Sequence, residues 1–257
     1  MLKFRIINII FILLLLLLIA IDWNNHVSVL LYAMLIIAYL LIVVYGVAVI
    51  SAQFFIPAVC RGSIRSNAIA ITFDDGPLPG KTERILKILN DHHVSAAFFC
   101  IGKRVEMHSG LLKQIHEAGH LIGNHSYSHS PAFDLQSSGK MLTELAATDT
   151  AIQRHLGIRP RFFRPPYGVT NPNLAKAIRK QNCLTVGWSI RSFDTMIKDK
   201  QRLFNRVTKN LKAGDIILFH DYCDVTIEIL PDFLTYVKHL GLNIARLDEH
   251  LNEKGYV

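Results

Sequence analysis

Two adjacent carboxylates, Asp74 and Asp75, follow a short apolar run in this 257-residue chain. The run from Ala68 to Ile71 predicts a buried strand, and Gly76-Pro77 turns the chain directly after the pair. A turn at a strand end can bring both side chains into one cleft, where their repulsion separates their proton affinities unless a cation intervenes. One carboxylate could then hold a metal ion and the other act as a base. A solvated Asp-Asp-Gly turn is the alternative.

Two histidines four residues apart, His125 and His129, come soon after a predicted strand at residues 121–123. At this spacing we expect both rings on one face of a helical turn, where they can bind one metal ion. The spacing alone is a weak signal. Its position at a strand end, on the same rim as Asp74 and Asp75, makes a shared metal site the stronger hypothesis.

A stiff loop, Arg164 to Gly168 with the sequence RPPYG, follows the predicted strand at residues 161–163. Consecutive prolines have no N–H groups, so the next backbone donor, that of Tyr167, can be held toward a reacting oxygen. An ordinary rigid turn is the alternative. The loop is therefore a candidate for stabilising negative charge.

Two further strand ends carry polar or aromatic side chains. The predicted strand at residues 183–188 ends at Trp188 and is followed by Asp194, and the strand at residues 215–219 is followed by His220. A histidine at a strand end can be a core or solvated residue. His220 is also a candidate general acid, which a reaction that has an aspartate base requires.

The elements that position these residues alternate between strand and helix about seven times. Predicted helices separate the strands, at residues 81–92, 111–118, 138–156, 174–181, 202–211 and 227–239, and the further strands lie at residues 96–100 and 243–245. This alternation predicts parallel strands with helical crossovers, hence a barrel-like α/β domain with its chemistry at the carboxyl ends of the strands.

The N-terminal part of the chain has a different character. Two apolar stretches, residues 6–21 and 27–50, predict a transmembrane hairpin with a tight polar loop from Asp22 to His26. Buried core helices or a signal peptide are the alternatives, although no clear small-x-small cleavage site follows the first stretch. We therefore divide the chain into a membrane anchor, residues 1–57, and a catalytic domain, residues 58–257.

Positive charge flanks the hairpin, with Lys3 and Arg5 before it and Arg61 and Arg65 after it. The positive-inside rule then predicts that both ends, and with them the catalytic domain, lie in the cytoplasm. If the first stretch is cleaved or only interfacial, a single span of the opposite orientation follows.

Composition narrows the function further. The net charge of +8 suits an anionic lipid surface or an anionic substrate, although general solubility explains it equally well. No basic run is interleaved with aromatic residues, so nucleic acid is not expected as a partner. The four cysteines form no C-x-x-C pair, which argues against a cysteine zinc site and a redox dithiol.

Together, these segments resemble the five motifs of the polysaccharide deacetylase (NodB-homology) family, carbohydrate esterase family four. The motifs, in chain order, are Thr72 to Pro77, His125 with His129, Arg164 to Gly168, Trp188 with Asp194, and Leu218 with His220. The resemblance covers roughly residues 67–247. It implies a distorted (β/α) barrel, a divalent metal ion, usually zinc with cobalt, nickel or manganese as alternatives, and hydrolysis of an acetamido group on a sugar.

The resemblance also implies roles for single residues. Asp75, His125 and His129 would hold the metal ion and leave positions for water and substrate, as a catalytic zinc requires. Asp74 would be the general base and His220 the general acid.

The remaining motif residues would support these groups. Arg164 would orient Asp74, and Asp194 would orient His220. The Tyr167 N–H and the metal ion would stabilise the tetrahedral intermediate. The resemblance implies that four residues bind the substrate, namely Pro166, Tyr167, Trp188 and Leu218.

Two positions depart from the family pattern. Where many members have Asp-x-x-Asp-Trp, this chain reads Arg191-Ser192-Phe193-Asp194-Thr195, so that an arginine replaces an acid and a threonine replaces an aromatic residue. The proposed metal and acid/base residues are unaffected. We therefore hypothesise that the pocket accepts a different acyl group or an anionic substrate.

The sequence thus predicts a membrane-anchored, metal-dependent hydrolase that removes the N-acetyl group from an acetamido sugar in a polysaccharide, peptidoglycan or lipid-linked saccharide. The expected partners are this saccharide and the lipid bilayer. The alternatives are an O-acetyl esterase or deformylase acting on a membrane-associated saccharide, and a non-catalytic carbohydrate-binding membrane protein. The sequence leaves the oligomeric state open.

Overall fold

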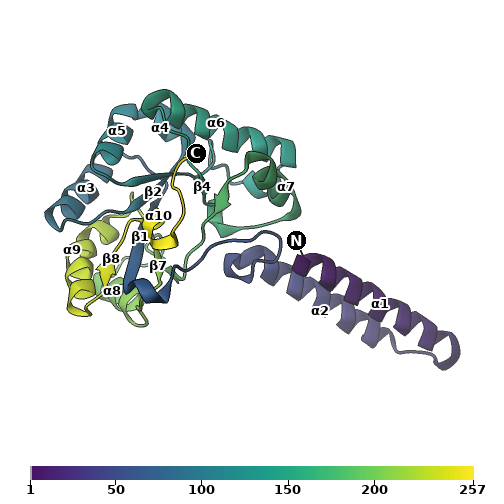
Figure 1. Ribbon diagram of the computed structural model, residues 1–257. Helices are drawn as coiled ribbons and strands as arrows, with labels where there is room; N and C mark the ends of the chain where they lie inside the picture. The colour runs from purple at the N-terminus through teal and green to yellow at the C-terminus, as the bar shows by residue number, and fades with distance from the viewer. Residues whose placement is uncertain (1) are drawn as a thin grey trace.

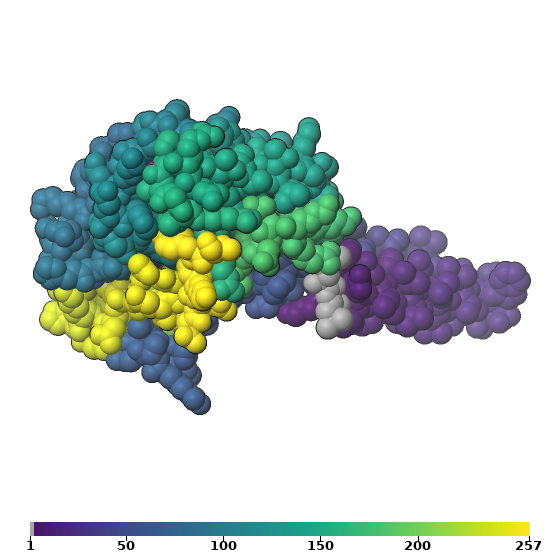
Figure 2. Space-filling model, turned by 45° about the horizontal axis from the view of Figure 1, so that its top comes forward, coloured from purple at the N-terminus to yellow at the C-terminus, as the bar shows by residue number. Residues whose placement is uncertain are grey.

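The computed structural model describes residues 2–257 and contains a helical hairpin joined to an α/β domain (Figure 1). The hairpin consists of α1 (Leu2–Asn25) and α2 (Val29–Ala48), which lie side by side and project from one side of the domain (Figures 1 and 2). Within the hairpin, Tyr39 stacks on Phe11 with ring centroids 4.2 Å apart and donates a hydrogen bond to Asn8 Oδ1 over 2.9 Å. Both helices are long and apolar enough to cross a membrane.

The turn of the hairpin is shorter than the predicted loop from Asp22 to His26. Helix α1 continues through Asn25, and only residues 26–28 are non-helical. Asp22 stays in the last turn of α1, where its carboxylate accepts hydrogen bonds from the Val27 N–H at 2.5 Å and from the Tyr32 hydroxyl at 3.3 Å. The polar residues were therefore correctly placed at the turn but wrongly excluded from the helix.

Eight parallel strands form the centre of the domain in the order β5-β4-β3-β2-β1-β7-β6, with β8 pairing to β1. They are β1 (Ala68–Asp74), β2 (Ala97–Cys100), β3 (Leu121–Asn124), β4 (Phe162–Phe163), β5 (Leu184–Thr185), β6 (Ile190–Arg191), β7 (Ile216–His220) and β8 (Asn243–Ile244). The order begins at β5 and ends at β6, and these two edge strands do not pair with each other. The barrel is therefore not closed, and the sheet is a curled half-barrel. This confirms the predicted distorted (β/α) barrel.

Helices cover the outside of the sheet (Figure 1). They are α3 (Thr82–Asp91), α4 (Gly102–Met107), α5 (Ser109–Glu117), α6 (Ser138–Leu156), α7 (Pro172–Gln181), α8 (Lys200–Thr208) and α9 (Asp224–His239). Helix α10 (Leu247–Leu251) instead packs against the interior face of the sheet, where Leu247 joins the core cluster of Ala70 and Phe162. Short 3₁₀ turns lie at η1 (Ile50–Ala52), η2 (Ile64–Ser66), η3 (Phe133–Leu135) and η4 (Pro166–Gly168). The helix predicted at residues 138–156 has the bounds of α6, because Ser137 caps its start and Gly157, at φ 71°, ends it.

The core explains why the central strands read as continuous apolar runs. All seven residues of β1 are buried, since helices cover one face of the strand and the barrel interior the other. On one face Phe73 stacks between Phe98 and Phe219, with ring centroids 5.1 and 6.0 Å away. This rigid centre holds the carboxyl ends of β1, β2, β3 and β7 side by side.

The segment after α2 partly closes the gap between β5 and the start of β7. Val59 forms a parallel bridge with Val186, next to β5, and Arg61 forms an antiparallel bridge with Asp215, next to β7. Arg61 also pairs with the buried Asp215 carboxylate at 2.6 Å. The chain that joins the hairpin to β1 is therefore part of the wall of the half-barrel.

Candidate active site

The first site residues come from the carboxyl end of β1. Asp74 is the last residue of the strand, and Asp75 directly follows it with a φ of 77°, in the left-handed region. This backbone conformation is uncommon for a residue other than glycine and redirects the Asp75 side chain. Both carboxylates consequently face one cavity, although adjacent strand residues normally point to opposite sides.

Glycine is needed at position 76 because the side chain of Asp221 lies directly against its backbone. A Cβ atom at this position would lie 2.1 Å from the Asp221 carboxylate. Asp221 is fully buried and accepts a hydrogen bond from Thr82 Oγ1 at 2.6 Å. Burial raises the pKa of Asp221 to about 7. The carboxylate thus supports the turn from behind, a role that the sequence did not reveal.

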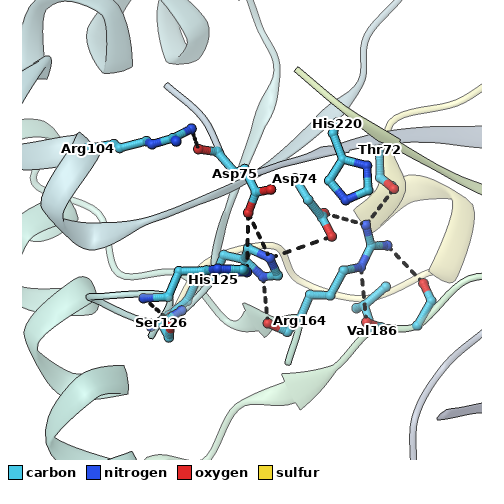
Figure 3. A network of polar contacts seen from close by, with 12 residues as sticks. Thr72, Asp74, Asp75, Arg104, His125, Ser126, Arg164, Val186 and His220 are labelled. Carbon is cyan, nitrogen blue, oxygen red and sulfur yellow. Dashed lines mark hydrogen bonds and ion pairs between the residues drawn. The ribbon is translucent and has the colours of Figure 1, made fainter. Parts of the chain in front are cut away.

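Arg164, predicted to orient Asp74, lies completely buried against it (Figure 3). Its Nη1 donates to Asp74 Oδ1 and to Thr72 Oγ1, both at 2.7 Å. The other guanidinium nitrogens donate to the carbonyls of Val186 at 3.3 Å and Gly187 at 2.9 Å. The guanidinium therefore holds one oxygen of Asp74 and leaves Oδ2 directed toward His125, whose Nε2 is 3.8 Å away.

Asp75, His125 and His129 form the cluster that was predicted to hold a metal ion. Their ligand atoms all lie within 4.8 Å of one another, with Asp75 Oδ1 3.5 Å from His125 Nε2 and 3.3 Å from His129 Nε2. Asp75 Oδ1 is buried and has no hydrogen-bond partner in the described part of the chain. His125 Nδ1 contacts the Arg164 carbonyl at 2.8 Å, which fixes the tautomer and leaves Nε2 free to bind a metal. The residues therefore fit a divalent cation.

The two histidines do not lie on a helical turn, and this prediction was wrong. They belong to a loop after β3 in which Ser126 and His129 have φ values of 62° and 48°. Asn124 Oδ1 accepts from the Ser126 N–H at 2.9 Å, and Glu144 accepts from the N–H of Ser128 at 2.7 Å. Side chains thus satisfy the loop's backbone donors and replace the helical hydrogen bonds.

His220 and Asp194 form the predicted pair on the other side of Asp74. His220 Nδ1 lies 2.7 Å from Asp194 Oδ1, and the second oxygen of Asp194 accepts from the His220 N–H and the Thr226 hydroxyl. Burial alone would lower the pKa of His220, but the hydrogen bond to Asp194 and its charge raise that pKa above its ordinary value. The pairing also lowers the pKa of Asp194 against the effect of burial. The imidazolium form of His220 is therefore favoured.

A cavity of about 200 Å³ joins these groups. Its lining consists of Asp74, Asp75, His125, His129, Pro165, Tyr167, Gly168, Trp188, Arg191, Thr195, Leu218, His220 and Tyr222. Of the residues predicted to contact substrate, Tyr167, Trp188 and Leu218 line it. Pro166 is buried outside the lining, and Pro165 takes its place because Tyr167, at φ 58°, turns the chain after the prolines. Arg164 and Asp194 lie behind the residues that they hold.

Two features of the structure require glycine at position 168. Its φ is 74°, and a Cβ atom there would lie 2.3 Å from the Trp188 ring. Trp188 therefore packs directly on the backbone of the RPPYG loop. This contact brings together two motifs that are 20 residues apart in the sequence and forms one wall of the cavity.

The sequence did not identify Tyr222 and Arg104. Tyr222 lines the cavity beside His220, with ring centroids 5.7 Å apart. Arg104, at the start of the chain's fourth helix, donates to the Asp75 carbonyl at 2.5 Å and so holds the turn (Figure 3). Tyr222 could have been predicted, because it follows His220 by only two residues in the sequence. No periodicity or motif in the sequence indicated a role for Arg104.

The fold is an open parallel α/β barrel, and a possible metal site of one aspartate and two histidines lies at the ends of its strands. A family model for polysaccharide deacetylases matches residues 61–186. A peptidoglycan-N-acetylglucosamine deacetylase of Bacillus cereus is 35% identical over 190 residues, a match that covers 72% of this chain and 69% of that protein. The chain belongs to the polysaccharide deacetylase family.

Another relative is longer. The peptidoglycan-N-acetylglucosamine deacetylase PgdA of Listeria monocytogenes is 33% identical over 186 residues, but the match covers 72% of this chain and only 39% of that protein. Among solved structures, the Bc1960 peptidoglycan N-acetylglucosamine deacetylase has a TM-score of 0.73 at 30% identity, covering 76% of this chain and 93% of that one.

A catalytically silent protein is equally similar in fold. BA3943 of Bacillus anthracis, described as a CE4 family pseudoenzyme, has a TM-score of 0.72 at 28% identity, covering 77% of this chain and 70% of that one. Fold similarity consequently does not distinguish active from inactive members. Activity instead depends on the side chains of the site.

Proposed function

We propose that this protein is a metal-dependent hydrolase that removes the N-acetyl group from an acetamido sugar of a polysaccharide, peptidoglycan or lipid-linked saccharide. The observation that carries the proposal is the arrangement around Asp74. One of its oxygens is held by the buried Arg164, its other oxygen faces the metal-binding cluster, and the His220–Asp194 pair lies beside it. A base, a Lewis-acid site and an acid thus meet in one cavity.

Asp75, His125 and His129 would hold the metal ion. When bound, the ion would polarise the acyl carbonyl and increase the acidity of a water molecule. The Arg164 carbonyl keeps a proton of His125 on Nδ1, so that Nε2 is directed to the metal ion as a ligand. The chemistry of the cluster does not select zinc over cobalt, nickel or manganese.

Asp74 acts as the general base in this proposal. The hydrogen bond from Arg164 occupies Oδ1, so Oδ2 is the oxygen that accepts a proton from the attacking water. Arg164 is itself held by four acceptors and cannot turn away. The base is therefore oriented before substrate binds.

His220 acts as the general acid. Its Nδ1 is engaged by Asp194, which leaves Nε2–H as the group that donates a proton to the departing nitrogen. The Tyr167 N–H is proposed to stabilise the negative charge that develops on the acyl oxygen. Leu218 and Trp188 supply an apolar wall for the methyl group of the acetyl moiety.

The experiment that tests this function replaces the base without removing a proposed metal ligand. We expect Asp74→Asn to lower kcat for N-acetylated chitin oligomers by at least about a hundredfold, because general base catalysis is lost. Its metal content, measured by mass spectrometry of the purified protein, should stay near that of the wild type. His125→Ala should lose both metal and activity.

Near-normal turnover by Asp74→Asn would show that Asp74 is not the base. Wild-type protein that binds metal but hydrolyses neither N-acetyl nor O-acetyl saccharides would favour the non-catalytic alternative. Including an O-acetylated oligosaccharide and an N-formylated sugar in the same assay separates a deacetylase from the esterase and deformylase alternatives, because water attack at this site serves all three acyl groups.

We further propose that the hairpin anchors the protein in a membrane, with the domain at residues 58–257 as the catalytic unit. The length and apolar surface of α1 and α2 support this, since almost none of their described residues is buried. An anchored enzyme would act on saccharides that are attached to the membrane or lie next to it.

A further inference from the structure

A second, basic cavity adjoins the active-site cavity. It has a volume of about 630 Å³, lies between the edge strand β6 and helix α8, and shares Arg191 with the active-site cavity. Its cationic lining consists of Arg61, Arg191, Arg202, Arg206 and Lys209. Among the described residues that line it there is no Asp or Glu. A cavity of this composition attracts anions.

Helix α8 directs three of these charges to one side. Arg202 and Arg206 of α8 and Lys209, the C-cap residue of this helix, are spaced four and then three residues apart, which places them on one side of the helix. Like charges at this spacing repel one another. Within the described part of the chain, neither the Arg202 nor the Lys209 side chain has an ion-pair partner, so the fold itself does not neutralise this face.

Arg191 connects the basic face to the reacting centre. Its guanidinium carbon lies 5.4 Å from the centroid of the Trp188 ring and 4.9 Å from that of Phe193, and the Arg206 guanidinium covers Phe193 at 4.2 Å. Arg206 also donates from Nε to the Arg191 carbonyl at 2.9 Å. Aromatic stacking positions a guanidinium while its N–H groups remain available to a ligand.

Burial lowers the pKa of Arg191, the charge of Asp74 opposes this shift, and the neighbouring charge of Arg206 acts in the same direction as burial. The guanidinium groups of Arg191 and Arg206 thus lie close enough to repel each other. A bound anion would remove this repulsion. Arg61 differs from the other four cations because it already pairs with Asp215 at 2.6 Å.

We propose that this cavity binds a phosphate group of the substrate, so that the protein deacetylates a phosphorylated acetamido saccharide. The inference rests on the proposed function and specifies its substrate class. One bidentate arginine is enough to bind a carboxylate. Four cations that have no ion-pair partner among the described residues instead match a phosphate, which has more acceptor oxygens and can carry more charge. Arg191, which lines both cavities, then places the phosphate next to the acetamido group on which Asp74 and His220 act as base and acid.

The phosphate could belong to a soluble sugar phosphate or to the linkage between a sugar and a lipid. Arg61 and Ser189 also line a third cavity of about 620 Å³, which reaches Ser51 and Gln53 just beyond α2. The basic cavity therefore has a neighbouring cavity that reaches the end of the hairpin, where a lipid carrier would lie. The two sources share the same recognition chemistry.

A binding experiment with the full-length, detergent-solubilised protein tests the cavity independently of turnover. The probe is glucose 1-phosphate, which has the phosphate but no acetamido group, and binding is measured by calorimetry at low and high salt. We expect wild-type binding that weakens with salt, and a loss of roughly tenfold or more in the Arg202→Gln/Lys209→Gln variant.

The matched control is Lys113→Gln/Lys140→Gln, which removes the same charge from exposed positions on α5 and α6. This variant should bind glucose 1-phosphate as the wild type does. Glucuronate is the carboxylate control. The proposal is overturned if Arg202→Gln/Lys209→Gln binds as tightly as the wild type, if both double variants lose affinity equally, or if glucuronate binds as tightly as glucose 1-phosphate.

Turnover then separates this inference from the proposed function. We expect Arg202→Gln/Lys209→Gln to raise KM for N-acetylglucosamine 1-phosphate and for prenyl-diphosphate-linked N-acetylglucosamine, and to leave turnover of neutral chitotetraose unchanged. A lower KM for the prenyl-linked substrate identifies the lipid linkage as the source. If the protein hydrolyses chitotetraose but Arg202→Gln/Lys209→Gln does not weaken its binding of glucose 1-phosphate, the phosphate site is refuted and the proposed function stands. If that variant weakens the binding but the protein hydrolyses none of the substrates, the proposed function is refuted and the phosphate site stands.

Discussion

Asp74 and Asp75 are neighbours in the chain, yet their carboxylates have different surroundings. Arg164 donates to Asp74 at 2.7 Å, whereas Asp75 Oδ1 is buried, unpartnered among the described residues, and faces two histidines. The left-handed backbone of Asp75 produces this difference by turning its side chain into the same cavity. Unusual backbone conformations at a site of this kind commonly serve function.

The His220–Asp194 pair predicts a specific pH dependence. Asp194 raises the pKa of His220, so the proton needed by the general acid is retained to higher pH. Asp194→Asn removes that charge, the pKa of His220 falls, and the protonated fraction is lost at lower pH. We expect the alkaline limb of the kcat/KM profile to move to lower pH and the maximal rate to fall, measured from pH 5 to 10.

A suitable control is Asp199→Asn, which removes an exposed carboxylate that caps α8 at a distance from the cavity. Its pH profile should match that of the wild type. An alkaline limb that does not move in Asp194→Asn would exclude His220 as the group that titrates there, since loss of the paired charge must lower its proton affinity.

Sequence reasoning located most of the site because its residues follow strands directly. The parallel alternation placed Asp74, Asp75 and His220 on one rim, and the structure brings them together. It did not find Arg104 or Asp221, which act on the backbone of the turn and have no motif of their own. Contacts of this kind depend on three-dimensional packing that no local pattern encodes.

At the scale of elements, the site loops depend on one another. The histidine loop is held by Glu144 of α6, whose carboxylate accepts from the N–H groups of Tyr127 and Ser128 at 3.1 and 2.7 Å. The RPPYG loop continues into Thr170, whose N–H donates to the Val47 carbonyl at 3.1 Å and whose hydroxyl donates to the Gly46 carbonyl at 3.2 Å. The end of α2 thus supports an active-site loop.

Gly46 offers a test of this junction. A Cβ atom there would lie 2.2 Å from the Phe54 ring, so Gly46→Ala forces the end of α2 away from the domain. Overpacking of this kind destabilises by about 1–3 kcal/mol. We expect the melting temperature in detergent to fall by roughly 2–4 °C per kcal/mol, together with reduced activity because Thr170 loses its support.

The matched control is Gly110→Ala in α5, where an added Cβ atom meets no heavy atom within 4 Å. Alanine is the better helix former by about 0.8–1 kcal/mol, so this variant should be slightly stabilised. If Gly46→Ala proves as stable and as active as Gly110→Ala, α2 does not support the domain in the way described.

The predicted elements agree with the structure where periodicity extends over several turns or strand residues, as in α6 and β1. Short elements were missed, namely α4, α10 and the two-residue β6. Strand β6 is half-buried at an edge and has too few residues to establish a pattern. Likewise, no sequence signal indicated that residues 57–61 would bridge the gap between β5 and the start of β7, because the bridges involve isolated residues.

At the scale of the whole molecule, the orientation of the hairpin remains a prediction. By the positive-inside rule, Lys3 and Arg5 before the hairpin and Arg61 and Arg65 after it predict that both ends lie in the cytoplasm. We expect a C-terminal phosphatase fusion, active only outside the cytoplasm, to be inactive, and a C-terminal fluorescent fusion that matures only in the cytoplasm to be bright.

A phosphatase inserted within residues 26–28 serves as the internal control, since the hairpin places this turn on the opposite side from both termini. It should be active. Strong activity of the C-terminal phosphatase fusion would reverse the orientation and would put the catalytic domain on the side where a finished cell-wall polymer is found.

The hydrogen bonds between Thr170 and the last turn of α2 also limit where along a saccharide the protein can work. If α2 spans a bilayer, its carboxyl end lies at the lipid surface and holds Thr170 there. Tyr167, which lines the catalytic cavity, precedes Thr170 by only three residues. The catalytic cavity would then lie at a constant, short distance from the lipid and could not reach the distant part of a long polymer. Sugars would be deacetylated while they are close to the membrane, so the positions of deacetylated sugars along a chain would depend on the order in which those sugars came near the membrane.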